Sequence, residues 1–183
     1  MDWRFDPILL TKKYSVSYHL EQFEMMCRWL GGAASRCITS FVDTYKNCPY
    51  QELQEEDILK LASGLGKIAR AYQLPLYTCA EKMNLERFGI GHSACIDKAK
   101  IGSLIGYKLD LRRDPGQRGE CHCVESMDIG TYHTCIHGCK YCYASGNPEN
   151  AKNKYQLHDP ESPLLVGNLR GDEVITKYNA ISG

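Results

Sequence analysis

The 183-residue sequence has no excess of charge of either sign, because 22 Lys and Arg residues balance 22 Asp and Glu residues. It also lacks an uninterrupted apolar run of roughly 18 residues, the length from which a membrane-spanning helix is inferred. Its first residues do not combine positive charge with an apolar stretch, as a secretory leader does. These absences argue against a strongly basic nucleic-acid-binding domain. They predict a cytoplasmic protein without a membrane partner, whose thiols stay reduced.

Cysteine, by contrast, is abundant, with ten residues in the chain. In a reducing compartment, metal binding or redox chemistry accounts for this number better than disulfide bonds do. Three cysteines are scattered early in the chain, and seven follow at Cys79, Cys95, Cys121, Cys123, Cys135, Cys139 and Cys142. The crowding of the last five predicts a metal site between residues 120 and 143.

Strand-like and helix-like segments alternate over the first two thirds of the chain. The expected strands cover residues 3–10, 37–42 and 74–80, and the expected helices cover residues 17–30, 55–72 and 95–105. Helix 55–72 gives the clearest signal, since it opens with three acidic residues and carries an apolar stripe at helical spacing. Three successive strand–helix units predict an α/β fold with a parallel sheet. A short edge strand is expected over residues 172–178.

Each of the three expected strands has an acidic residue within it or directly after it. These residues are Asp6, Asp43 and Glu81. In a (β/α) barrel the carboxyl ends of the strands form the active-site rim. We therefore expect these carboxylates to converge as catalytic or substrate-contacting groups, joined by Arg4, which shares a strand face with Asp6. Helix capping, loop solvation or a structural Arg4–Asp6 ion pair would explain the same residues without a catalytic role.

The prediction for the fold is a partial (β/α) TIM-type barrel over residues 1–111, followed by a cysteine-rich iron–sulfur segment and tail over residues 112–183. An open doubly wound sheet is the alternative. A turn-rich polar stretch at residues 112–119 separates the two predicted parts.

The late cysteines form a distinctive pattern, Cys135-Ile-His-Gly-Cys139-Lys-Tyr-Cys142, with the spacing C-x3-C-x2-C. Three thiolates on one tight loop can hold three irons of a [4Fe–4S] cluster and leave the fourth iron open to an exogenous ligand. Gly138 lets the loop wrap closely, and Tyr141 can shield one face of the cluster. This segment is the predicted iron–sulfur site.

The same segment matches the radical S-adenosylmethionine signature, and it resembles the spore photoproduct lyase branch, in which tyrosines also flank the last cysteine. A longer match points to an uncharacterised prokaryotic family, known as domain of unknown function eighteen forty-eight. That resemblance covers nearly all of the chain and is carried by Trp3-Arg-Phe-Asp-Pro-Ile8, Ser40-Phe-Val-Asp43, Thr78-Cys-Ala-Glu81, Cys95-Ile-Asp97, Cys121-His-Cys123 and Tyr141-Cys142-Tyr143-Ala144. Because members of the family are longer, it implies that this chain is the C-terminal part of a barrel.

The resemblance to radical enzymes implies that S-adenosylmethionine binds the open iron and that an electron-donor protein serves the cluster. It suggests a nucleic-acid substrate by analogy, and a small-molecule substrate is equally open. The expected reaction is radical chemistry by a lyase or oxidoreductase of unknown substrate. The alternative is a non-catalytic binding module stabilised by an iron–sulfur cluster or zinc.

Four cysteines remain for a second metal site: Cys79, Cys95, Cys121 and Cys123. Four thiolates can fully ligate an auxiliary cluster or a structural Zn²⁺. In a different interpretation, Cys79 and Cys95 are small buried hydrophobic residues. A zinc site built from Cys121, Cys123, Cys139 and Cys142 is a further rival, although it leaves Cys135 without a role.

Overall fold

The computed structural model describes residues 1–44, 48–144 and 146–174. The chain forms two compact units, one of Met1–Thr44 with Tyr50–Ser126 and the other of Tyr45–Pro49 with Met127–Gly183. The division expected at residues 111 and 112 stays a prediction. No described helix is both long and apolar enough to cross a membrane.

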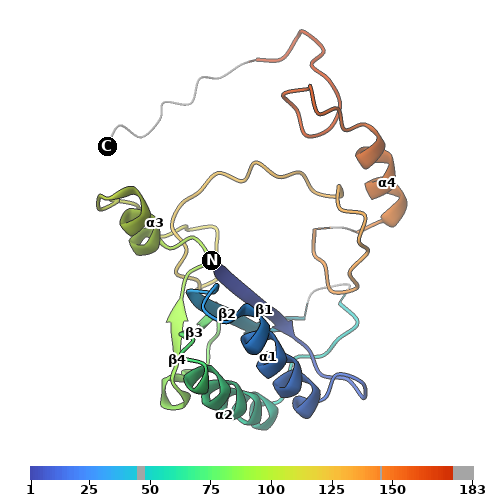
Figure 1. Ribbon diagram of the computed structural model, residues 1–183. Helices are drawn as coiled ribbons and strands as arrows, with labels where there is room; N and C mark the ends of the chain where they lie inside the picture. Colours follow the sequence, from blue (N-terminus) through green and yellow to red (C-terminus); the bar gives the residue numbers. More distant parts are fainter. Residues whose placement is uncertain (45–47, 145, 175–183) are drawn as a thin grey trace. The chain divides into compact units, whose positions relative to one another are not determined.

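A parallel sheet forms the centre of the first unit (Figure 1). Its strands are β1 (Asp2–Ile8), β2 (Arg36–Phe41), β3 (Leu76–Cys79) and β4 (Ile90–Ser93), in the order β1-β2-β3-β4. All three neighbouring pairs are parallel. The expected parallel α/β architecture is therefore confirmed. The expected partial TIM-type barrel is not shown, because the four strands in the described part of the chain form an open sheet.

Two helices, α1 (Val16–Leu30) and α2 (Glu55–Ala71), pack on one face of this sheet (Figure 1). The Ser15 hydroxyl caps α1 by accepting a hydrogen bond from the amide of Tyr18, as N-cap serines do. The core of this layer combines residues from both helices and all four strands: Trp3, Ile8, Phe23, Cys37, Phe41, Leu61, Leu65, Leu76 and Ile90. Burial of these side chains is the main source of the unit's stability.

The opposite face of the sheet is polar near its edge strand. Because side chains alternate along a strand, Trp3 and Phe5 pack in the core while Asp2, Arg4 and Asp6 occupy the other face. Parallel sheets are usually apolar on both faces. The polar character of this face therefore makes it the candidate location of a functional site.

Gly66 of α2 is required by close packing against the short 3-10 helix η1 (Glu86–Phe88). A Cβ atom at position 66 would lie 2.1 Å from the carbonyl oxygen of Phe88, whereas at Gly64 it would meet only the end of the Leu20 side chain. We expect Gly66→Ala to lower the free energy of unfolding by about 1–3 kcal/mol, the usual cost of overpacking.

Gly64→Ala is the matched control, since it sits in the same helix and alanine favours a helix by about 1 kcal/mol over glycine. Urea denaturation followed by circular dichroism would compare the two variants. A Gly66→Ala protein as stable as its Gly64→Ala counterpart would contradict the packing described here.

Two further helices are shorter. They are α3 (Lys98–Ile105) in the first unit and α4 (Pro148–Gln156) in the second. The helix expected over residues 95–105 thus begins three residues later, at the Asp97 cap. Of the edge strand expected over residues 172–178, residues 172–174 form no strand and the rest lie outside the described residues.

Candidate metal centre

Three cysteine thiols meet at the carboxyl ends of β3 and β4. Cys79 is the last residue of β3, Cys95 follows β4 by two residues, and Cys123 comes from a later loop. Their Sγ atoms all lie within 4.8 Å of one another, and the Sγ atoms of Cys79 and Cys95 are 3.0 Å apart. Cys79 and Cys123 are buried while Cys95 is exposed. In the described part of the chain, no other three His, Cys, Asp or Glu ligand atoms approach so closely.

The strand pairing explains why Cys79 and Cys95 meet. The Cα of Cys79 lies opposite that of Ser93, so the chain leaving β4 passes beside the end of β3. The third thiol is held by backbone contacts: the amide of Val124 donates to the carbonyl of Ile96 at 3.2 Å, and the amide of Ile96 donates to Cys123 Sγ at 3.4 Å. A metal-binding arrangement therefore arises from three separate segments of one unit.

Cys121 lies next to this group, in one buried cluster with Cys123. It is buried and packs with Cys123 and Ala94. The carbonyl of Cys121 accepts a hydrogen bond of 2.8 Å from Nε of Arg113, which fixes the local backbone. Cys121 is thus a fourth thiol close to the three that converge.

The residue between Cys121 and Cys123 in the sequence is His122. The His122 ring packs against His92 with 4.5 Å between ring centroids. Both histidines line a cavity of about 260 Å³ together with Thr78 and Glu81. Nε2 of His92 donates to the carbonyl oxygen of Glu120 at 2.9 Å, which anchors the segment that carries Cys121 and Cys123.

The charge on the thiols is set by their mutual contacts. A hydrogen bond from Cys79, reinforced by the guanidinium of Arg4, lowers the pKa of Cys95 to about 5. The same hydrogen bond, together with burial, raises the pKa of Cys79 well above its ordinary value. Arg4 Nη1 lies 2.8 Å from Cys95 Sγ. Cys95 is therefore the thiolate of the pair, and a thiolate is the form that binds metals.

The predicted rim residues divide into two contact groups. Arg4 forms an ion pair with Asp6, whose carboxylate also accepts a hydrogen bond of 3.3 Å from the Ser40 hydroxyl. Arg4 also contacts the Cys95 thiol, so this ion pair lies next to the three thiols. Arg4 and Asp6 share a strand face as the sequence predicted, and their assignment to catalysis stays a prediction.

The second group contains Glu81 and Asp43, which lie near Arg118, a residue that the sequence did not indicate for the rim. Oε1 of Glu81 accepts a hydrogen bond of 2.8 Å from the backbone amide of Phe41, which links the ends of β2 and β3. Asp43 forms an ion pair with Arg118. Burial raises the pKa of Glu81 to about 7, with the neighbouring Asp43 charge adding to the effect and the Phe41 amide opposing it.

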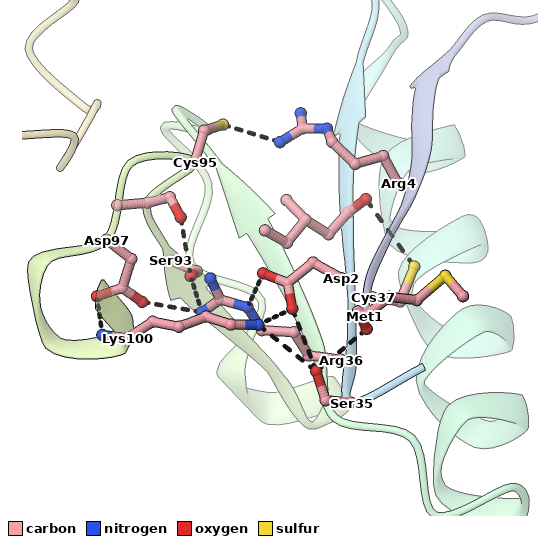
Figure 2. A network of polar contacts seen from close by, with 12 residues as sticks. Met1, Asp2, Arg4, Ser35, Arg36, Cys37, Ser93, Cys95, Asp97 and Lys100 are labelled. Atoms are coloured by element: carbon pink, nitrogen blue, oxygen red, sulfur yellow. Dashed lines mark hydrogen bonds and ion pairs between the residues drawn. The ribbon is translucent and has the colours of Figure 1, made fainter. Parts of the chain in front are cut away.

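An ion-pair network supports the loop that carries Cys95 (Figure 2). The guanidinium of Arg36 contacts Asp2 at 2.8 Å, Asp97 at 2.9 Å and the Ser93 hydroxyl at 3.0 Å. Lys100 forms a further ion pair with Asp2. Because Ser93 and Asp97 flank Cys95, this network fixes both ends of the loop. The sequence analysis did not find it, since the four charged residues come from distant parts of the chain.

The Asp2 carboxylate makes this network sensitive to acid. Partial burial raises the pKa of Asp2, but hydrogen bonds from Lys100 and Arg36 outweigh that effect and leave the pKa below its ordinary value. A carboxylate with a lowered folded-state pKa stabilises the fold above its unfolded pKa of about 3.9 and loses that contribution as the pH falls through the folded value.

We therefore expect Asp2→Asn to cost about 1 kcal/mol at neutral pH and progressively less as the pH falls through the folded-state pKa, where the wild-type carboxylate also becomes neutral. Urea unfolding at several pH values would measure the difference. Glu56→Gln, which removes an exposed ion pair with Lys60 on α2, is the control and should change less at neutral pH. A difference between Asp2→Asn and the wild type that stayed constant with pH would contradict this assignment.

The thiols of the C-x3-C-x2-C segment lie in the second unit. Cys135 and Cys139 are exposed and Cys142 is partly buried. The amide of Cys142 donates to the carbonyl of Cys139 at 3.0 Å, and Gly138 adopts a left-handed φ of 64°. In the described part of the chain, the three Sγ atoms do not approach within 4.8 Å of one another. Their role as cluster ligands, and that of Tyr141 as a shield, stay predictions.

Comparison with known proteins identifies one family. A family model described as "Domain of unknown function (DUF1848)" matches residues 1–144. A search of curated proteins and a search of solved structures found no match to the chain. The matched region contains the β-sheet, the converging thiols and the C-x3-C-x2-C segment. The chain therefore belongs to the DUF1848 family.

Proposed function

We propose that this protein binds a single transition-metal ion through Cys79, Cys95 and Cys123, with Cys121 as the fourth thiolate. The observation that carries the proposal is the approach of three Sγ atoms within 4.8 Å of one another. A Zn–S distance of about 2.3 Å in a tetrahedron separates neighbouring sulfurs by about 3.8 Å. In a [4Fe–4S] cluster each thiolate binds a different iron, so the sulfurs stand farther apart. The observed spacing thus favours one ion over a [4Fe–4S] cluster at these residues.

The donor set favours zinc or iron, because soft thiolate ligands select these metals. A centre with four protein ligands has no open position and is structural rather than catalytic. In this proposal the ion joins the end of β3, the loop after β4 and the segment around Cys123, so the protein is a metal-stabilised binding module. A cytoplasmic location would keep these thiols reduced.

Cobalt provides a direct test, because Co²⁺ in a tetrahedral thiolate site has intense visible absorption. We expect the reduced, metal-free full chain to bind one equivalent of Co²⁺ with that spectrum and to release it when Zn²⁺ is added. The spectrum should be lost in Cys79→Ser and retained in Cys139→Ser. Weak absorption typical of octahedral cobalt, or the reverse pattern in the two variants, would refute the proposal.

A second candidate function rests on the C-x3-C-x2-C segment. Three thiols on one loop, two of them exposed, with Gly138 in a left-handed turn, support a [4Fe–4S] cluster at Cys135, Cys139 and Cys142. In this candidate the protein is a radical S-adenosylmethionine-type enzyme. Its substrate is a small molecule or a nucleic acid, and a separate protein donates electrons.

In the same candidate, Arg4, Asp6, Asp43 and Glu81 contact the substrate. The sequential order of the parallel strands supports a partial barrel. Anaerobic reconstitution with iron and sulfide, followed by electron paramagnetic resonance, tests this function. A cluster signal that changes with S-adenosylmethionine and disappears in Cys139→Ala supports it. A signal indifferent to both would exclude it.

A further inference from the structure

The two closest thiols of the metal centre are nearer to each other than a bound ion requires. Cys79 Sγ and Cys95 Sγ lie 3.0 Å apart, against the separation of about 3.8 Å expected around a tetrahedral ion with bonds of 2.3 Å. A disulfide bond, at about 2.05 Å, needs the sulfurs to move together by a similar amount. The observed separation of the two sulfurs lies between these two arrangements.

The two thiols differ in their access to solvent. Cys95 is exposed, whereas Cys79 is 7% exposed and Cys123 is 6% exposed. A small solute that reaches the centre therefore meets Cys95 first. The guanidinium of Arg4 lies 2.8 Å from Cys95 Sγ (Figure 2), where its positive charge can stabilise a departing hydroxide.

We propose that Cys79 and Cys95 are a redox pair, which hydrogen peroxide or a similar small hydroperoxide converts to a disulfide. The thiolate of Cys95 attacks one peroxide oxygen, which gives a sulfenic acid and releases hydroxide, and the hydroxide takes a proton to become water. The Cys79 sulfur then attacks the sulfenic sulfur and displaces a second water. Two thiols lose two electrons in total, and one peroxide is reduced to two waters.

The position of Cys123 makes the pairing selective. Cys123 belongs to the same group of sulfurs. The sulfur in direct contact with Cys95 Sγ, however, is that of Cys79, at 3.0 Å. Cys79 is therefore the resolving thiol, and Cys123 keeps its free form after oxidation. Linked to the proposed function, the disulfide removes two of the metal's ligands, so that oxidation and metal binding exclude each other.

Mass spectrometry of the full chain tests the pairing independently of metal binding. The reduced, metal-free protein is treated with one equivalent of hydrogen peroxide, alkylated and digested. We expect a disulfide between the peptides that carry Cys79 and Cys95, in the wild type and in Cys123→Ser. In Cys79→Ser, Cys95 should instead be trapped as a sulfenic acid by dimedone.

Cys139→Ser controls for simple exposure, since Cys139 is exposed in the other unit. Its removal should leave the Cys79–Cys95 disulfide unchanged. Oxidation that falls mainly on Cys135 or Cys139, or a disulfide from Cys95 to Cys123, would overturn the proposal. A correct disulfide in a protein that never binds Co²⁺ would retain the redox pair and refute only the proposed metal function.

Discussion

Replacing Cys95 with serine is expected to weaken metal binding at the thiolate centre by at least about 100-fold. Loss of a residue that merely supports a ligand costs 10–100-fold in metal affinity, so loss of a direct thiolate ligand should cost at least the upper value. Cys95 is also the thiol that Arg4 contacts, and the remaining three thiols of the proposed centre are buried. Serine preserves the size of the side chain while removing the soft donor atom.

Competition against a chromophoric zinc chelator measures this affinity. Zinc at 1,000 times its dissociation constant should stabilise the wild type by about 4 kcal/mol, so thermal unfolding gives a second readout. That stabilisation should vanish in Cys95→Ser and persist in Cys139→Ser. Equal zinc affinities in the two variants would show that ions bind elsewhere in the chain.

Replacing Phe23 with alanine is expected to lower the free energy of unfolding by about 3–5 kcal/mol, because it removes the largest fully buried side chain of the core. Phe23 is fully buried in α1. It stacks on Trp3 with 5.1 Å between ring centroids and meets Phe5 edge-on at 5.2 Å. Aromatic pairs of this geometry add to the free energy of burial itself.

Trp29→Ala provides the matched control, since Trp29 is a large aromatic residue of the same helix that is 71% exposed. Its loss should change stability by less than about 1 kcal/mol, as surface substitutions usually do. Urea denaturation of both variants gives the comparison. Similar losses for the two would mean that α1 does not bury the face assigned to it.

Local patterns predicted the main elements of the first unit. The apolar spacing of α1 and α2 and the strands β1 to β3 were recognisable, because amphipathic periodicity depends on neighbouring residues alone. β4, with the sequence Ile-Gly-His-Ser, was missed since it is short and contains glycine. α4 was also missed, although Asn147 caps it and Pro148 opens it, because its residues are almost all polar and leave no apolar stripe.

The candidate site was harder to predict from the sequence than these helices and strands. Elimination grouped four cysteines in the sequence: Cys79, Cys95, Cys121 and Cys123. The pairing of β3 with β4 brings the first two together, and the hydrogen bond from the Val124 amide to the Ile96 carbonyl brings Cys123 to them. Neither contact can be read from local sequence. The spacing of Cys135, Cys139 and Cys142 indicates that they bind one metal centre, but it does not determine where their sulfurs lie. The Arg4–Asp6 pair was foreseeable, because residues two apart on a strand share a face.

His122 lies between Cys121 and Cys123 in the sequence, and its ring contacts that of His92 in β4. The backbone of His122 cannot shift without moving Cys121 and Cys123 with it. A nuclear magnetic resonance signal from the His122 imidazole would consequently report on metal binding or oxidation at the sulfurs.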